Sequence, residues 1–148
     1  MFIGVIGASK CDSKTAALAE RVGEQIAKAG AHLVCGGLGG VMEHAAKGAR
    51  EAGGTTIGIL PGKDKKEANP YIDIPIVTGL SYARNILVVS TCDVVIALPG
   101  KYGTLSEIAF ALNIGKSVIG IETWDIPGII KADDAEDALL KAKEVLKT

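Results

Sequence analysis

Short apolar runs alternate with longer segments of helical periodicity along most of the chain, and this alternation limits the possible folds more than any other feature. The runs have the composition of buried strands, whereas the segments between them repeat apolar residues at helical spacing. Such alternation predicts an α/β fold: a Rossmann-like, doubly wound, mostly parallel sheet with helices on both faces. The predicted strands are residues 2–6, 32–35, 55–60, 74–77, 93–98 and 118–121, and the predicted helices are residues 13–29, 41–52, 81–90, 104–114 and 133–147.

The composition fits one domain that spans residues 1–148. Apolar residues make up 48% of the chain and aromatic residues only 4%, so we expect a core of tightly packed aliphatic side chains. The formal net charge of −1 offers little attraction to nucleic acid or anionic lipid. The sequence shows neither a signal peptide nor an apolar run near the ~18 residues of a membrane span, so we expect a cytoplasmic protein.

The cysteines and histidines do not form a pattern typical of metal ligands. The chain has an odd number of cysteines, Cys11, Cys35 and Cys92, and no CxxC pair. We therefore expect their thiols to be reduced and buried. Cys11 lies in a loop close to the site proposed below. His32 and His44 have no ligand spacing with each other or with a cysteine, and we therefore expect no metal site.

Glycine-rich turns follow three of the predicted strands, at Gly7, residues 36–40 and residues 100–103. In a doubly wound sheet the carboxyl ends of the strands share one edge, and ligands bind there near the point where the strand order reverses. Neither a dinucleotide GxGxxG motif nor a P-loop is present. Several glycine turns at one edge favour a ligand site over tight connections alone.

Residues 98–107 form the stretch that bears most directly on function, because they join a buried strand to a helix through glycines and a hydroxyl. Gly100 and Gly103 allow the backbone to approach a ligand, and the N–H groups of the following helix attract an anion. Glu107 is predicted to lie in the first turn of that helix, near the bound group. The stretch predicts a phosphate cradle with a carboxylate beside it.

Arg84, at the start of the predicted helix 81–90, has a fork of donors suited to phosphate or ribose oxygens and to orienting Glu107. The alternatives are a solvated arginine and, for Glu107, a carboxylate that only complements the helix dipole. Lys101 is interpreted as a phosphate donor or as an exposed loop lysine. Glu43 and His44 are interpreted as pocket or plain helix residues. Aromatic residues available to stack on a base are Tyr71, Tyr82, Tyr102 and Trp124.

Residues 99–107 closely resemble the PGGxGTxxE signature of the LOG ("lonely guy") proteins, which are nucleoside 5′-monophosphate phosphoribohydrolases. Residues 36–42 resemble the other glycine motif of that family, and Arg84 matches the arginine upstream of the signature. The resemblance covers Gly4 to about Ile121. Lys101 replaces the second glycine of the signature, and Asn85 replaces the lysine that usually follows the arginine. The pattern also resembles a shorter branch that is similar to the molybdenum-cofactor carrier proteins.

The resemblance implies hydrolysis of an N-glycosidic bond to a base and ribose 5-phosphate, with no cofactor. The alternatives are a non-catalytic carrier or sensor of a nucleotide or molybdopterin-like ligand, and an interaction domain with a vestigial pocket. A pyridoxal-phosphate lysine decarboxylase is rejected, since no residue is identified as its lysine. The resemblance also implies a homodimer or larger homo-oligomer. Arg84 and Glu107 are the expected catalytic residues, and the expected phosphate-binding residues are Gly36, Gly37, Gly39, Gly40, Gly100, Lys101, Gly103 and Thr104.

Overall fold

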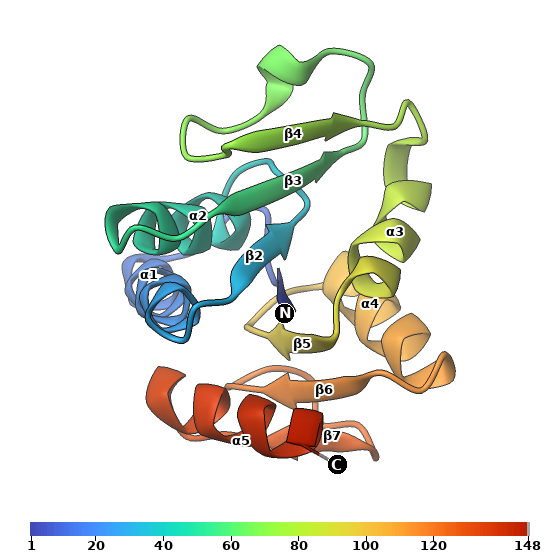
Figure 1. Ribbon diagram of the computed structural model, residues 1–148. Coiled ribbons are helices and arrows are strands. Elements are labelled where there is room, and N and C mark those ends of the chain that lie inside the picture. The colour runs from blue at the N-terminus through green and yellow to red at the C-terminus, as the bar shows by residue number, and fades with distance from the viewer. Residues whose placement is uncertain (148) are drawn as a thin grey trace.

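The computed structural model describes residues 1–147 as a seven-stranded sheet with helices on both of its faces (Figure 1), which confirms the predicted α/β class. The strands are β1 Phe2–Ile6, β2 His32–Cys35, β3 Thr56–Leu60, β4 Ile74–Val77, β5 Val94–Ala97, β6 Ser117–Gly120 and β7 Ile129–Lys131. The α-helices are α1 Ser13–Lys28, α2 Val41–Glu51, α3 Arg84–Thr91, α4 Tyr102–Asn113 and α5 Ala135–Lys147, and two short 3-10 helices are η1 Lys65–Glu67 and η2 Ser81–Ala83.

All neighbouring strands are parallel, in the order β4-β3-β2-β1-β5-β6-β7. The chain runs outward from β1 through β2 and β3 to β4, and then returns to place β5 on the other side of β1. Ile3 is therefore paired with Leu33 on one side and with Val94 on the other. The strand order reverses between β1 and β5, and a crevice is expected at their carboxyl ends.

The sheet separates two apolar clusters, because successive side chains of a strand point to opposite faces. Along β5, Val94 and Ile96 pack on the side of α1, α2 and α5, while Val95 and Ala97 pack on the side of α3 and α4. Figure 1 shows the same division of the helices between the two faces. Burial on both faces explains why this strand has a continuous apolar sequence.

Helix α1 begins at Ser13, the first residue of the predicted helix 13–29, although Ser13 is also a residue type that can cap a helix. Asp12, not Ser13, is the N-cap, and its Oδ1 accepts a hydrogen bond from the backbone N–H of Thr15 at 2.8 Å. Ser13 is instead the first residue of the helix. Aspartate satisfies the free N–H groups of a first turn as well as serine does, so the two neighbouring residues could not be separated by type alone.

Three features of the fold differ from the prediction, and the first two affect residues of the site. Ser81 has a φ of 53°, which no α-helix contains, and in place of the predicted helix 81–90 the structure has η2 over residues 81–83 followed by α3 from Arg84. Helix α4 begins at Tyr102, which places Glu107 in its second turn and not in its first. The strand β7 was missed because it has three residues and directly follows Pro127 and Gly128, which indicate a turn. No described helix is long and apolar enough to cross a membrane.

Candidate functional site

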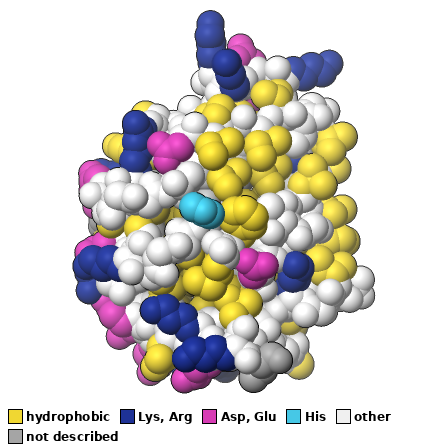
Figure 2. All heavy atoms as spheres, in the orientation of Figure 1, with side chains coloured by type: hydrophobic (Ala, Val, Ile, Leu, Met, Phe, Trp, Pro, Cys, Tyr) yellow, Lys and Arg dark blue, Asp and Glu magenta, His cyan; other side chains and the backbone are white. Residues whose placement is uncertain are grey.

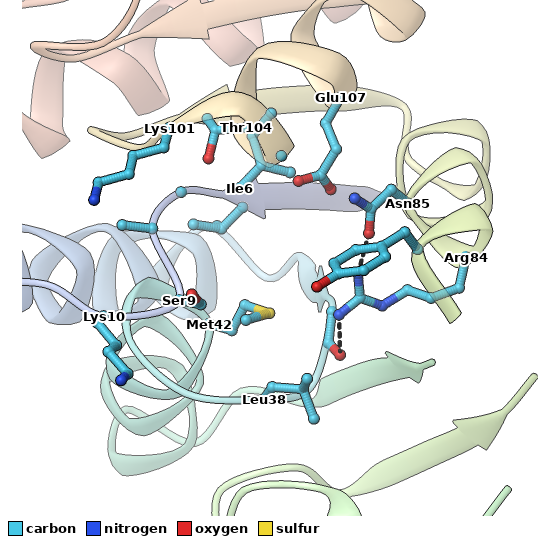
Figure 3. A pocket seen from close by; sticks show the side chains of 16 residues that line it. Ile6, Ser9, Lys10, Leu38, Met42, Arg84, Asn85, Lys101, Thr104 and Glu107 are labelled. Atoms are coloured by element: carbon cyan, nitrogen blue, oxygen red, sulfur yellow. Dashed lines mark hydrogen bonds between the residues drawn. The ribbon is translucent and has the colours of Figure 1, made fainter. Parts of the chain in front are cut away.

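A cavity of about 500 Å³ opens at the carboxyl ends of β1, β2 and β5, where the strand order reverses. Its walls come from the loops that follow these three strands and from the beginnings of α2, α3 and α4 (Figure 3). This is the place where doubly wound sheets bind their ligands. The lining residues are Val5, Ile6, Gly7, Ala8, Ser9, Lys10, Gly36, Leu38, Met42, Tyr82, Arg84, Asn85, Lys101, Gly103, Thr104 and Glu107.

The cavity contains most of the site predicted from sequence. The predicted residues that line it are Gly36, Arg84, Lys101, Gly103, Thr104 and Glu107. The predicted residues that do not line it are Gly37, Gly39, Gly40 and Gly100. Neither Glu43 nor His44 contributes to the wall, so for these two the interpretation as plain helix residues agrees with the structure.

Packing accounts for glycine at two of the positions outside the cavity wall. A Cβ atom on Gly100 would lie 2.0 Å from Thr104 Oγ1 and 3.0 Å from the backbone nitrogen of Ala8. Gly40 has a φ of 63°, and a Cβ atom there would lie 2.3 Å from the carbonyl oxygen of Ala8. Both glycines allow the loop after β1 to pack closely against its neighbours. They shape the site without contacting its interior.

Arg84 joins three parts of the structure beneath the cavity. Its Nε donates a hydrogen bond to the carbonyl oxygen of Ile59 at 2.8 Å, and its Nη2 donates to that of Gly36 at 3.3 Å. Nη1 donates to Oδ1 of Asn85. The residue is only 7% exposed, and burial lowers the pKa of its guanidinium group, partly offset by the nearby negative charge of Glu107. Arg84 is therefore a fixed buried cation, not a solvated one.

Glu107 is partly buried in the cavity wall, and the structure gives its carboxylate no hydrogen-bond or ion-pair partner within residues 1–147. Burial opposes the charged form and raises the pKa of Glu107 to about 7, although the positive charge of Arg84 acts in the opposite direction. Desolvation is therefore the larger effect on both members of the pair. Near neutral pH the carboxyl group exists in both protonation states, as a group that exchanges a proton requires.

The N-terminus of α4 lies on the cavity wall without a side-chain cap. Its N-cap is Lys101, which makes no capping hydrogen bond, and the next residues include Gly103 and Thr104. The first N–H groups of a helix lack partners within it and favour an anion. The Thr104 side chain is buried, yet within the described chain its hydroxyl has no hydrogen-bond partner. The indole N–H of Trp124 donates to the Lys101 carbonyl oxygen at 3.1 Å and holds this turn.

The two ends of the cavity differ in character. Lys10 and Lys101 lie at one end, where both side chains are exposed, whereas Arg84 and Asn85 lie at the other (Figure 3). Sequence reasoning missed Lys10. The signal was present, because Lys10 comes shortly after the first predicted strand and therefore had to lie at the same edge as the glycine turns. Leu38 and Met42 add an apolar part of the wall that sequence alone did not indicate.

The cysteines lie outside the cavity wall. Cys35 and Cys92 are buried, and burial raises the pKa of each thiol to about 12, which agrees with the prediction of inert, structural thiols. Cys11 is partly buried, and all three are free thiols. Within residues 1–147, no group of three or more His, Cys, Asp or Glu side chains is placed to hold a metal ion.

The family of the chain follows from comparison with known proteins. The model of the SLOG cluster4 family matches residues 1–148. The chain belongs to this family. A protein from Archaeoglobus fulgidus is 51% identical over 122 residues, which cover 82% of this chain and 80% of the relative. The cytokinin riboside 5′-monophosphate phosphoribohydrolase of Mycobacterium tuberculosis is 34% identical over 127 residues, covering 79% of this chain and 67% of the relative. The predicted LOG-like resemblance is confirmed.

Two solved structures match this SLOG cluster4 chain over nearly its whole length. The molybdenum cofactor binding protein of Rippkaea orientalis has a TM-score of 0.93 and 38% identity, covering 98% of this chain and 96% of its own. The molybdenum cofactor carrier protein of Chlamydomonas reinhardtii has a TM-score of 0.92 and 38% identity, covering 99% of this chain and 98% of its own. The predicted similarity to the carrier branch is also confirmed.

Proposed function

We propose that this protein binds a phosphorylated, nucleotide-like small molecule, with its phosphate at the N-terminus of α4. The main support is the composition of one end of the cavity. Two lysines from different loops, Lys10 and Lys101, lie there together with the start of α4, which has no side-chain cap. Ammonium groups and free backbone N–H groups are suited to a phosphate dianion. The free hydroxyl of Thr104 adds a further hydrogen-bonding group there.

The activity proposed is carriage of the ligand without turnover. Both solved carrier and cofactor-binding structures align with almost the full length of the chain, whereas the match to the phosphoribohydrolase covers 67% of that relative. The hydrogen bonds of Arg84 also favour carriage over turnover. Three nitrogens of its guanidinium group already donate to Ile59, Gly36 and Asn85, so its main task is to hold the wall.

Hydrolysis of a nucleoside 5′-monophosphate is the second candidate, and Glu107 is the observation that favours it. In that reaction the bond from C1′ to the base nitrogen breaks, water adds its oxygen to C1′, and a proton from the water reaches the departing base. An ionised Glu107 beside C1′ would stabilise the oxocarbenium-like charge. Because the pKa of Glu107 is raised to about 7, the rate of this reaction would rise as the pH increases through that value.

A thermal-shift screen followed by an assay for base release separates these functions. The purified protein is mixed with nucleoside 5′-monophosphates and with a pterin monophosphate, and free base is measured by chromatography. We expect at least one ligand to raise the melting temperature by about 5–10 °C at a hundredfold excess over its Kd. No base should appear. If the wild type releases free base and Glu107→Gln does not, hydrolysis replaces carriage as the function. If no ligand raises the melting temperature, phosphate binding is contradicted.

A further inference from the structure

Tyr82 is an aromatic residue whose exposure the packing of the chain does not explain. It belongs to η2, directly before α3, and 85% of its surface is exposed although it lines the cavity. The chain has two Phe, three Tyr and one Trp, and among residues 1–147 Tyr82 is the only aromatic residue that lines the cavity. Sequence left four aromatic residues open as partners for a base. The structure reduces them to one.

The backbone that presents Tyr82 is held on both sides. Before it, the N–H of Ser81 donates to the carbonyl oxygen of Pro61 at 2.9 Å, and Ser81 itself has a positive φ of 53°. After it comes Arg84, which is anchored to Ile59 by a 2.8 Å hydrogen bond. A left-handed conformation at a residue with a side chain persists only where the surroundings enforce it, and such positions gather at ligand sites. The ring of Tyr82 is therefore exposed on a constrained support.

The position of Tyr82 complements the phosphate end of the cavity. Lys10 and Lys101 lie at one end, and Arg84 lies at the other, two residues after Tyr82 (Figure 3). A ligand with a phosphate at the lysines would extend its remaining part towards the Arg84 end. Exposed aromatic faces bind flat heterocycles by stacking, and every such heterocycle has a suitable face.

We propose that Tyr82 is the platform on which the flat heterocycle of the ligand stacks, while its phosphate is held at the other end of the cavity. The inference rests on the proposed function, since it assumes a phosphorylated ligand. It goes further by naming the second recognition group and the class of ligand. That class is a phosphomonoester joined to a planar nitrogen heterocycle, a purine nucleotide or a pterin monophosphate.

Another use of Tyr82 has to be separated from this one by experiment. Leu80, Ile86 and Leu87 are also exposed, and Figure 2 shows hydrophobic side chains along the side of the molecule where α3 lies. A second copy of the chain that covers this face would bury Tyr82 as well. If Tyr82 lies in the interface of the homo-oligomer expected from the family resemblance, substitution of Tyr82 should change the molar mass of the protein. If Tyr82 stacks on the ligand, the substitution should change the affinity for that ligand.

The test compares ligands with and without the ring. Isothermal titration measures the binding of adenosine 5′-monophosphate, neopterin monophosphate and ribose 5-phosphate to the wild type and to three Tyr82 variants. Tyr82→Ala should weaken binding of at least one ring-containing ligand by about 5- to 100-fold, the range expected from loss of one stacked base. Tyr82→Phe should bind this ligand nearly as tightly as the wild type does. Tyr82→Leu, which lacks a ring, should bind it more weakly. Ribose 5-phosphate should bind equally to all four proteins.

Controls separate failure of this inference from failure of the proposed function. Tyr71→Ala removes a ring outside the cavity wall and should bind as the wild type does. If Tyr82→Ala binds every ring-containing ligand normally, or loses affinity for ribose 5-phosphate equally, stacking is contradicted while phosphate binding stands. A changed molar mass by light scattering with unchanged affinity assigns Tyr82 to an interface between copies. If the wild type binds none of the three compounds, both proposals fail.

Discussion

Two of the three glycine-rich turns that suggested a ligand site contain glycines with different physical roles. In the turn after β2, a Cβ atom on Gly36 would lie 2.7 Å from Arg84 Nη2, and one on Gly40 would lie 2.3 Å from the backbone of Ala8. In the turn after β5, a Cβ atom on Gly103 would meet no atom within 4 Å, and Gly103 lines the cavity. The first turn needs glycine to pack the wall. In the second turn Gly100 also serves packing, since an added Cβ atom would lie 2.0 Å from Thr104 Oγ1, whereas at Gly103 the missing side chain leaves open space at the cavity.

The largest loss of stability is expected on substitution of Gly40. Gly40→Ala places a methyl group against the Ala8 carbonyl oxygen and forces an L residue to a φ of 63°, so we expect a loss of about 2–4 kcal/mol in the free energy of unfolding. Urea denaturation measures this loss. Gly53→Ala is the matched control, because Gly53 has a φ of 83° but no atom within 4 Å of the added Cβ. A loss as small as that of Gly53→Ala would contradict a packing role.

Glu107 sharpens the comparison, because, like Gly103, it lines the cavity. Its pKa in the folded chain, about 7, lies above the ordinary value of 4.5. Ionisation therefore costs stability, and this cost grows from about pH 4.5 to pH 7 and stays constant above. Glu107→Gln should raise the free energy of unfolding by about 2–3 kcal/mol at pH 8 and leave it unchanged at pH 4. Denaturation curves at both pH values measure the difference.

An exposed acid provides the control for this pH effect. Glu144→Gln, on the exposed side of α5, removes the same charge away from the cavity and should not reproduce the gain at pH 8. If the wild type and Glu107→Gln show parallel stability curves between pH 4 and pH 8, then burial does not oppose the charge of Glu107. The pH dependence expected for hydrolysis, the second candidate function, would then lose its basis.

The lysines at the phosphate end should change affinity while leaving stability nearly intact. Lys10 and Lys101 are exposed and, within the described chain, form no ion pair, so Lys10→Ala and Lys101→Ala should leave the melting temperature close to that of the wild type. Each should weaken binding of ribose 5-phosphate by about tenfold at low salt, and less at high salt, because screening reduces the contribution of an exposed charge. Lys143→Ala, on α5, is the matched control. Equal affinities in all four proteins would place the phosphate elsewhere.

Only a small effect on stability is expected at Gly103. Because its added Cβ meets open space, Gly103→Ala should change the free energy of unfolding by only about 0.5 kcal/mol, in the stabilising direction, since alanine favours the helix. Ligand affinity should fall more clearly than stability changes, because the methyl group occupies the cavity wall beside the phosphate position. Urea denaturation measures the change in stability of Gly103→Ala, and calorimetric titration with ribose 5-phosphate measures its change in affinity. A strongly destabilised Gly103→Ala would remove the difference between Gly103 and the tightly packed glycines.

Sequence alone predicted the layered fold well, because buried strands and amphipathic helices leave distinct periodic patterns. It failed where geometry depends on a single backbone conformation or on a short element. The positive φ of Ser81 excludes this residue from an α-helix, and β7 has only three residues. The early start of α4 moved Glu107 by part of a turn, since the helix begins at Tyr102 and not at Thr104 as predicted.

The site was predictable where residues follow strands, and less so where packing decides. Arg84, Lys101 and Glu107 meet at one cavity because all lie near the carboxyl edge of the sheet. The glycines could not be divided into packing and ligand-facing groups, since the neighbours that would collide with a Cβ atom come from distant parts of the chain. The partners of Arg84 were equally hidden, because Ile59 and Gly36 are far from it in sequence.

The most direct test of phosphate binding at the start of α4 is a calorimetric titration of the wild type with adenosine 5′-monophosphate and with adenosine. The two ligands differ only in the phosphate group. We predict that the nucleotide binds and that adenosine binds at least about tenfold more weakly, since it lacks charge-assisted hydrogen bonds to the lysines and the helix N-terminus. Binding of adenosine as tight as that of the nucleotide would contradict the account.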